Sequence, residues 1–341
     1  MSAMNSEMST TTSSPSTSSD YYFDSYSHYS IHEEMLKDSV RTKTYRDAIL
    51  KNPHLFKDKI VLDVGCGTGI LSLFAAKAGA KHVYGLEKSG IIELAREIVQ
   101  DNGYADRITL IQGKAEEVTL PVGQVDILIS EWMGYFLLYE SMLETVLFCR
   151  DKWLKPNGML MPDKAVLYIT AIEDNEYPDK ITYWDCVYGF DLSAIKKIAK
   201  SEPLVDTVAA QAVCSTSSKI LSLDLLTCTK DDCNFKSRFS IKCSRDAYLH
   251  GLCAYFEVAF TQIHKPLGFS TAPFAKYTHW KQTVFYFDNL EIIVVDGDEI
   301  DGEICCVKNN TNNRDLDISL TINCNGEHTH VNNFKQEYTL C

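Results

Sequence analysis

Apolar residues follow two different patterns along the chain, and the pattern changes near residue 162. Over residues 53–162, short, mostly apolar runs alternate with segments whose pattern is typical of helices. Such runs are typical of parallel strands buried on both faces, and their alternation with helices predicts a doubly wound, Rossmann-like parallel sheet. We expect strands at 59–64, 81–86, 108–112 and 125–130 and a helix at 70–78.

From residue 163 to residue 341, apolar and polar positions alternate in short stretches separated by polar turns. A period of two with few intervening helices predicts antiparallel strands that form a β-barrel or a sandwich. The fold class is therefore an α/β domain followed by an all-β domain. We expect strands at 165–172, 235–243, 253–260, 282–287, 291–295 and 315–324.

A segment at about 175–208 interrupts this strand pattern. It contains a predicted helix at 192–200 and several large apolar residues, which would be a liability if a monomer exposed them. We therefore predict a helical arm that contacts a second subunit. The residues concerned are Tyr177, Ile181, Tyr183, Trp184, Val187, Tyr188 and Phe190.

The N-terminal segment divides into two parts. Residues 1–20 are rich in Ser and Thr and lack apolar periodicity, so we expect a disordered tail. Residues 21–52 bring aromatic residues and then a helical stretch, 31–50, which ends before Asn52-Pro53.

Charge and composition narrow the class of partner. The chain carries 33 basic and 46 acidic residues, a formal net charge of −13. Such a surface repels nucleic-acid phosphates and attracts basic peptides, so we expect a basic protein substrate and no direct nucleic-acid contact. No run approaches the roughly 20 apolar residues of a membrane span, and the N-terminus lacks a signal-peptide pattern, so we expect an intracellular protein without a membrane segment.

The cysteines predict neither disulfides nor a metal site. Twelve cysteines occur, but no C-x-x-C does, and the nearest cluster, Cys324 with His328 and His330, lacks a second cysteine pair. Free, buried thiols are the expected state in an intracellular chain.

The turn after the first strand indicates a cofactor site. Gly65-x-Gly67-x-Gly69 lets the backbone approach a ligand closely, but Ile70 stands where a dinucleotide fingerprint requires glycine. Glu87 follows 22 residues after Gly65, at the end of the next strand, where a carboxylate accepts the hydroxyls of a ribose. The pattern therefore predicts a ribose-containing cofactor without pyrophosphate recognition. Asp63 precedes this turn, and Glu116, after the third strand, is placed to reach an adenine amino group.

The segment after the fourth strand indicates the reacting site. Glu131 and Glu140 flank an aromatic, apolar stretch at the carboxyl end of that strand. A continuous helix would place them on opposite faces, whereas Gly134 permits a turn that brings them together. Two close carboxylates repel each other, and a guanidinium between them removes that penalty.

At this point the chain resembles the protein arginine methyltransferases, and in particular their type I branch. The resemblance extends from about residue 20 to the C-terminus. It is carried by the aromatic motif at 22–26, the cofactor motif at 61–69, the double-glutamate segment at 131–140 and the Thr-His-Trp segment at 278–280. It implies S-adenosylmethionine as cofactor, S-adenosylhomocysteine as product, and a homodimer in the nucleus and cytoplasm. The implied products are mono- and asymmetric dimethylarginine in histone tails and Gly-Arg-rich proteins.

The resemblance also assigns expected roles to individual residues. Glu131 and Glu140 are expected to hold the substrate arginine, and His279 to pair with Asp38 and pass on the departing proton. Arg41 is expected to bind the methionine carboxylate of the cofactor. The remaining expected cofactor residues are Tyr22, His32, Met35, Asp63, Gly65, Gly67, Gly69, Glu87 and Glu116, and the expected substrate residues are Tyr26, Met142 and Trp280.

The main alternative is a methyltransferase of nucleic acids, which would share the cofactor half. Such enzymes are expected to carry an Asn/Asp-Pro-Pro-aromatic segment where this chain has Ser130-Glu-Trp-Met-Gly134. The chain also departs from the type I pattern at Cys66 and Lys88, which stand where serine and a small residue are expected. Lys88 is placed to form an ion pair with Glu87 and so to alter cofactor affinity.

Overall fold

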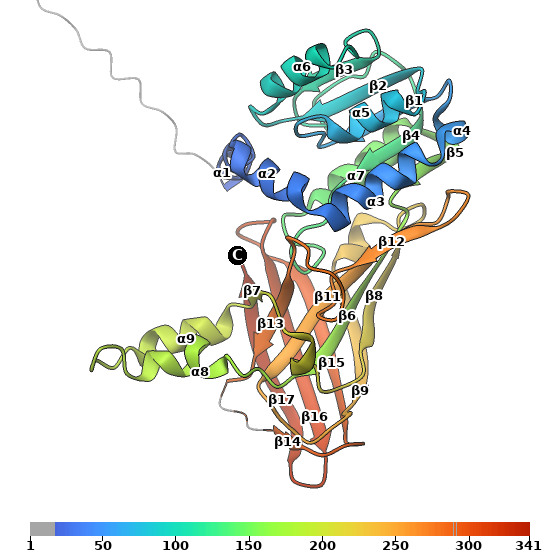
Figure 1. Ribbon diagram of the computed structural model, residues 1–341. Coiled ribbons are helices and arrows are strands. Elements are labelled where there is room, and N and C mark those ends of the chain that lie inside the picture. The colour runs from blue at the N-terminus through green and yellow to red at the C-terminus, as the bar shows by residue number, and fades with distance from the viewer. Residues whose placement is uncertain (1–17, 289, 291) are drawn as a thin grey trace, which may run out of the picture.

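The computed structural model describes residues 18–288, residue 290 and residues 292–341 (Figure 1). The predicted disordered tail therefore lies outside the described residues, except for its last three positions, which begin helix α1 (Ser18–Ser25).

A parallel sheet forms the first large unit, as the apolar runs predict. Within the described residues its order is β3-β2-β1-β4-β5, and every neighbouring pair is parallel. β1 and β4 are almost wholly buried, which explains why their sequences, IVLDV and VDILIS, are mostly apolar. The elements are β1 (Ile60–Val64), α5 (Ile70–Lys77), β2 (His82–Glu87), α6 (Ile92–Asp101), β3 (Ile108–Gln112), β4 (Val125–Ser130), α7 (Met142–Trp153) and β5 (Leu154–Met161).

The helical stretch that we predicted as continuous over 31–50 is broken at Asp38. Helix α2 (Tyr29–Lys37) ends there and α3 (Ser39–Leu50) begins, followed by the short α4 (Pro53–Phe56). Asp38 has an extended backbone with ψ of 96°, and its Oδ1 accepts hydrogen bonds from the backbone N–H of Val40 and of Arg41, both at 3.0 Å. The carboxylate thus replaces the backbone acceptor that a continuous helix would provide, which makes Asp38 an N-cap.

The C-terminal unit consists of antiparallel sheets around a common core. The larger sheet has the order β7-β13-β11-β6-β8, with β12 paired to β11, and the smaller has the order β17-β16-β15-β9. The edges of the two sheets meet at an isolated bridge between Ser215 and Cys243, so the unit is an incompletely closed barrel. The strands are β6 (Lys164–Ile172), β7 (Leu204–Asp206), β8 (Ser218–Asp224), β9 (Phe235–Lys242), β10 (Ala247–Leu249), β11 (Gly251–Phe260), β12 (Leu267–Ser270), β13 (Gln282–Tyr286), β14 (Ile292–Val294), β15 (Glu299–Lys308), β16 (Leu316–Asn325) and β17 (His330–Leu340).

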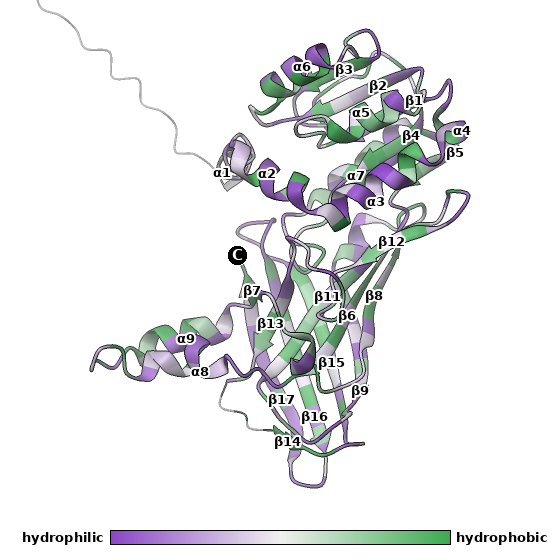
Figure 2. Cartoon of the chain, in the orientation of Figure 1, coloured by the Kyte–Doolittle hydropathy of each residue, from purple (hydrophilic) through white to green (hydrophobic). Residues whose placement is uncertain are grey.

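Inward and outward positions alternate along these strands. In β16 every second residue is buried from Leu316 to Cys324, and Figure 2 shows hydrophobic and hydrophilic residues mixed along the barrel strands. This is the period of two that predicts a strand with one face toward a core.

The predicted arm projects from the side of the barrel (Figure 1). It comprises α8 (Tyr177–Lys180), a short 3-10 turn at Thr182–Asp185 and α9 (Ser193–Ser201). Ile181, which we predicted to be exposed, is instead 2% exposed and packs in a small core with residues of β6, β11 and β13. It anchors the base of the arm, whereas Tyr188 and Phe190 near its tip are 93% and 72% exposed.

Three further properties concern the described residues alone. None of their helices is long and apolar enough to cross a membrane. They bring together no group of three or more His, Cys, Asp or Glu side chains that could hold a metal ion. All twelve cysteines lie within the described ranges and none forms a disulfide there.

Candidate active site

A cavity of about 460 Å³ lies at the carboxyl ends of β1 and β4. The chain order reverses between these two neighbouring strands, which is where ligands bind in open parallel sheets, and the volume suits a small-molecule ligand. Most of the predicted site residues border this cavity, although they come from distant parts of the chain. They are Tyr22, Tyr26, His32, Met35, Arg41, Gly65, Gly67, Glu87, Glu116, Glu131, Glu140, Met142, His279 and Trp280.

Asp63 and Gly69, which we predicted to bind the cofactor, do not border the cavity. Asp63 is fully buried beneath the turn, where its Oδ2 accepts a hydrogen bond of 2.7 Å from Ser72 of α5. Burial raises the pKa of the Asp63 carboxyl to about 7. Gly69 begins α5 with a φ of 84°. Both residues belong to the strand end and the turn beside the cavity, and neither borders the cavity itself.

The glycine turn fits a ligand that approaches the backbone closely. Gly65 and Gly67 have φ values of 70° and 53°, in the region that side chains disfavour. A Cβ on Gly65 would lie 2.8 Å from Cε of Met142, and one on Gly67 would lie 3.1 Å from the ring of His32. The cavity floor therefore depends on the absence of side chains at these two positions, as a cradle for S-adenosylmethionine requires.

Glu87 is held by the backbone at the end of β2. Its Oε2 accepts a hydrogen bond of 2.9 Å from the N–H of Gly67, and its Oε1 accepts one of 2.8 Å from the N–H of Ser89. Because each carboxylate oxygen has two acceptor positions, one remains on each oxygen for the two hydroxyls of a ribose. Within the described chain Glu87 makes no ion pair with Lys88, so the pairing that we predicted is absent. Lys88 borders the cavity instead.

Two other predicted cofactor residues border the cavity from different elements. Glu116, on the loop after β3, accepts a hydrogen bond of 3.2 Å from Thr145 of α7. Nε2 of His32, on α2, lies 2.8 Å from the carbonyl oxygen of Tyr26. Each side chain is therefore held by a hydrogen bond to a neighbour outside the glycine turn.

The segment after β4 doubles back on itself at Gly134, as we predicted. The Gly134 N–H donates a hydrogen bond of 3.1 Å to the carbonyl of Leu137, and a Cβ at Gly134 would lie 2.1 Å from the carbonyl oxygen of Tyr139. Only glycine fits this approach. The rest of the loop stores backbone strain, which is frequent at functional sites. Residues with left-handed φ are Phe136, Leu137, Glu140 and Ser141.

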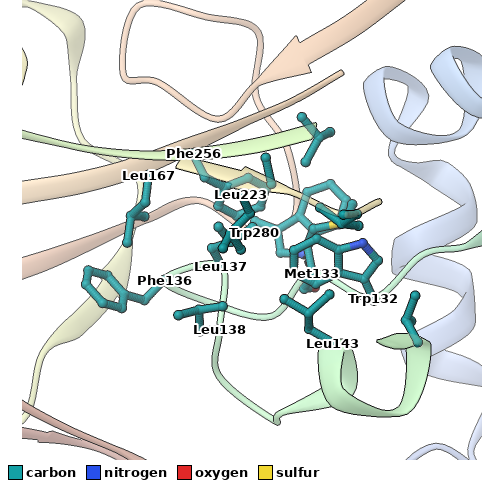
Figure 3. Close-up of a cluster of buried hydrophobic side chains, with 14 of the residues drawn as sticks. Trp132, Met133, Phe136, Leu137, Leu138, Leu143, Leu167, Leu223, Phe256 and Trp280 are labelled. Atoms are coloured by element: carbon teal, nitrogen blue, oxygen red, sulfur yellow. Dashed lines mark hydrogen bonds between the residues drawn. The ribbon is translucent and has the colours of Figure 1, made fainter. Parts of the chain in front are cut away.

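Apolar packing holds the strained loop in place. Figure 3 shows side chains of the loop and of α7 packed with side chains of β6, β8 and β11 and with Trp280 of the Thr-His-Trp segment. The Trp280 indole is 3% exposed, and its N–H donates a hydrogen bond of 2.7 Å to the carbonyl of Met133. We predicted Trp280 as a substrate residue; although it borders the cavity, its N–H supports the loop.

Glu131 pairs with Arg41 inside the cavity. Nε and Nη2 of Arg41 donate to the same oxygen, Oε2 of Glu131, at 2.9 and 2.8 Å. Both side chains are 7% exposed, so the ion pair is shielded from water. Arg41 was predicted to bind the cofactor, and the structure adds a contact with Glu131. Since both bonds use Oε2, Oε1 keeps its acceptor positions.

Glu140 lies in the same cavity with a different set of neighbours. Its Oε2 accepts a hydrogen bond of 2.9 Å from the hydroxyl of Tyr26. Burial raises the pKa of Glu140 and the charge of Glu131 adds to the rise, while Tyr26, Tyr22 and Arg314 oppose it. A positive charge between the two carboxylates would relieve this penalty, as the sequence pattern predicts.

Asp38 and His279 join the N-terminal helices to the barrel. Oδ2 of Asp38 lies 2.8 Å from Nδ1 of His279 and accepts a hydrogen bond of 3.0 Å from its backbone N–H. Burial would raise the pKa of Asp38, but hydrogen bonds from His279 and Arg41 outweigh it and lower the pKa. Because Asp38 also caps α3, the same carboxylate positions Arg41 and His279.

Sequence reasoning missed the residues that the barrel contributes through the turn between β15 and β16. Asn313 and Arg314 border the cavity about 170 residues away from the loop that they contact. Their signal in the sequence is only a polar turn between strands, so contact with the site could not be inferred.

The fold, the glycine turn, the Glu87 carboxylate and the paired glutamates together define an S-adenosylmethionine-dependent methyltransferase with a cationic acceptor. Comparison with known proteins narrows the class. Residues 163–327 match the family described as the arginine methyltransferase oligomerization subdomain, and residues 61–158 match a methyltransferase domain. The chain belongs to the protein arginine N-methyltransferase family.

Individual relatives support this membership along more than nine tenths of the chain. Protein arginine N-methyltransferase 1 of Chlamydomonas reinhardtii is 58% identical over 322 residues, which cover 94% of this chain and 93% of the relative. The protein of the same name from Schizosaccharomyces pombe is 58% identical over 310 residues, 91% of each. A solved structure, the Trypanosoma brucei PRMT1 enzyme-prozyme heterotetrameric complex with AdoHcy, has a TM-score of 0.90, 46% identity, and covers 93% of this chain and all of that one.

These findings confirm the predicted fold class, cofactor and activity. The protein uses S-adenosylmethionine to methylate arginine in proteins, and it belongs to a family whose C-terminal subdomain is an oligomerization unit. A nucleic-acid methyltransferase is not favoured.

Removal of the Glu87 carboxylate should weaken cofactor binding. We expect Glu87→Ala to bind S-adenosylhomocysteine at least tenfold more weakly in calorimetry, which corresponds to about 1.4 kcal/mol. The matched control is Glu97→Ala, which changes an exposed glutamate on α6 and should bind S-adenosylhomocysteine with unchanged affinity. Unchanged affinity in Glu87→Ala would mean that Glu87 does not bind the ribose.

Proposed function

We propose that the protein is a type I enzyme that forms mono- and asymmetric dimethylarginine in basic protein segments such as histone tails and Gly-Arg-rich sequences. The observation that carries the proposal is the presence of Glu131 and Glu140 in one cavity beside the glycine turn. Each carboxylate can accept two N–H groups of a planar guanidinium. Together they fix its plane and direct one terminal nitrogen toward the turn.

The cofactor supplies an electrophilic methyl group on a sulfonium, and the protein's own residues position the acceptor. Glu140, which burial keeps less acidic than usual, gains most from a cation beside it. Glu131 is paired with Arg41 through Oε2 and offers Oε1 to the substrate. In this proposal Arg41 contacts the cofactor carboxylate as well, so that one guanidinium orients Glu131 and the cofactor together.

The departing proton requires an acceptor near the site. His279 borders the cavity, and Asp38 fixes its Nδ1 at 2.8 Å. Orientation by a carboxylate through one ring nitrogen leaves the other ring nitrogen to exchange protons. We assign His279 this relay, with Asp38 as the residue that positions it.

Product choice depends on the space around the acceptor nitrogen. Met35 and Met142 both border the cavity, and Met142 lies against the glycine turn. Two flexible thioethers can admit one methyl on the reacting nitrogen while opposing rotation of the guanidinium. A steric cost of about 1.4 kcal/mol suffices for a tenfold preference.

A product assay tests this function. A Gly-Arg-rich peptide incubated with labelled S-adenosylmethionine should yield monomethyl and asymmetric dimethylarginine after acid hydrolysis and chromatography. Glu131→Gln and Glu140→Gln should abolish transfer, because each variant loses charge-assisted hydrogen bonds of about 1.5 to 3 kcal/mol each and, in addition, the alignment of the acceptor nitrogen. Mainly symmetric dimethylarginine would refute the type I proposal. Normal turnover in both variants would refute the role of the glutamates.

We also propose that the protein is a homodimer whose arm docks on the cofactor domain of a second subunit. Exposed apolar side chains at the arm, including Tyr183, Phe190 and Ile198, support this proposal, and exposed Leu94 of α6 offers an apolar contact on the cofactor domain. Contiguous exposed apolar residues of this kind commonly mark protein interfaces.

Disruption of the arm should separate the subunits. We expect deletion of the arm, or Phe190→Glu combined with Ile198→Glu, to give an inactive monomer in light scattering and turnover assays. Tyr248→Glu, which changes an equally exposed aromatic residue on β10, should remain a dimer. An active monomer would count against the proposal.

We further propose that the protein acts in the nucleus and cytoplasm. The twelve unpaired cysteines support this proposal, because thiols are kept reduced in both of these compartments. Fractionation of cells that produce the tagged protein should recover it in both fractions, and recovery from membranes or medium alone would contradict this.

A further inference from the structure

The turn between β15 and β16 of the barrel reaches the active-site cavity. Asn313 and Arg314 border the cavity, and Lys308, where β15 ends, forms an ion pair with Glu144 of α7. The barrel therefore contacts the cofactor domain here by polar groups, in addition to the apolar packing shown in Figure 3.

The guanidinium of Arg314 lies against helix α1. Its Cζ is 3.6 Å from the centroid of the Tyr22 ring and 5.2 Å from that of Phe23. A planar guanidinium at the shorter distance stacks on the ring and is attracted by its negative face. Tyr22 in turn packs on Tyr26, with ring centroids 5.0 Å apart, and the Tyr26 hydroxyl donates to Glu140.

Arg314 also forms two hydrogen bonds with the backbone of Glu140. Nη1 of Arg314 donates a hydrogen bond of 2.7 Å to the Glu140 carbonyl, and the Glu140 N–H donates one of 2.9 Å to the Arg314 carbonyl. Next to it, the Ser141 hydroxyl donates a hydrogen bond of 2.6 Å to the carbonyl of Asn313.

These bonds act where the loop is strained. Glu140 and Ser141 have φ values of 74° and 60°, which cost free energy in residues that carry a side chain. A strained conformation persists only when its surroundings hold it. The bonds with Arg314 hold Glu140 in this way, and the bond from Ser141 to the Asn313 carbonyl holds the next residue.

We propose that Arg314 is a positioning residue for methyl transfer, which holds Glu140 in its strained conformation and couples it to Tyr22 of α1. This inference rests on the proposed role of Glu140. Arg314 touches the backbone of Glu140 and the rings of α1, so it acts through these groups and not on the reacting atoms. Tyr22, Tyr26 and Glu140 thereby form one unit with the barrel.

The chemistry of the contact requires arginine. One planar group must stack on Tyr22 with its face and donate to the Glu140 carbonyl with its edge. A lysine ammonium keeps the charge but has no face to stack. The charge itself has a second effect, because it opposes the repulsion that Glu140 experiences from Glu131.

The test compares three variants in the peptide methylation assay, with the thermal midpoint measured for each. We expect Arg314→Lys to lower kcat at least tenfold with an unchanged thermal midpoint, and Arg238→Lys, which changes an exposed arginine of β9, to have no effect. In a Tyr22→Leu background the loss caused by Arg314→Lys should shrink at least threefold, because the stacked pair is already broken. A kcat of Arg314→Lys within twofold of the parent would overturn the inference, as would full additivity with Tyr22→Leu.

The pH profile separates charge from geometry. Glu140 is surrounded by Glu131, Tyr22, Tyr26 and Arg314, so Arg314→Met should shift the acidic limb of the kcat profile to higher pH, while Arg314→Lys should leave it in place. An unshifted acidic limb in Arg314→Met would contradict the proposed effect of the Arg314 charge on Glu140.

The variant Glu140→Gln, measured in the same assay, shows which of the two proposals has failed if the results differ from these expectations. An inactive Glu140→Gln beside a fully active Arg314→Lys refutes only this inference, whereas full activity in both refutes the proposed role of Glu140.

Discussion

Two carboxylates in one shielded cavity are the constraint on which the rest of this site depends. Glu131 and Glu140 both border the cavity, and their mutual repulsion adds to the cost of burying Glu140. A folded protein must offset that cost with cations and hydrogen-bond donors. Arg41 supplies two donors to Glu131, and Tyr26 supplies one to Glu140. Arg314 opposes part of the repulsion at Glu140, and a guanidinium bound between the two carboxylates would relieve the rest.

The donors come from elements that are far apart in the sequence, and this explains why two domains are needed. Arg41 lies on a helix whose start is capped by Asp38, and Asp38 also binds His279 beside the barrel. The double-glutamate loop is supported from the barrel side through the Trp280 N–H. The site thus forms where the N-terminal helices, the carboxyl edge of the sheet and the barrel meet. A cofactor domain alone would hold the ligand but would leave the paired carboxylates without this support.

The local parts of this arrangement could be predicted from the sequence, because each depends on neighbouring residues. The strand before Gly65 is a mostly apolar run, and the reversal at Gly134 follows from a glycine between two glutamates. The break between α2 and α3 at Asp38 could not be predicted from the sequence. The apolar pattern there is that of a continuous helix, and only the hydrogen bonds of the Asp38 side chain mark the new helix start. Asp63 was wrongly predicted to border the cavity. The sequence does not determine whether a side chain at the end of a strand points toward the cavity or, as here, toward α5.

The net charge of the protein acts over long distances and affects the approach of a substrate, whereas the two glutamates in the cavity act at short distance and affect its recognition. Surface charges in physiological salt are screened beyond about 8 Å, so the formal charge of −13 speeds the approach of a basic segment and does little to orient it. Two charges 4 Å apart interact by about 1 kcal/mol in water and by about 4 kcal/mol at an effective dielectric constant of 20. Glu131 lies in the second situation, since its side chain is 7% exposed. Selection of a guanidinium over other cations must therefore come from the cavity, where planar geometry and two acceptors matter. A lysine ammonium would be attracted by the same surface, but it cannot satisfy both carboxylates in one plane.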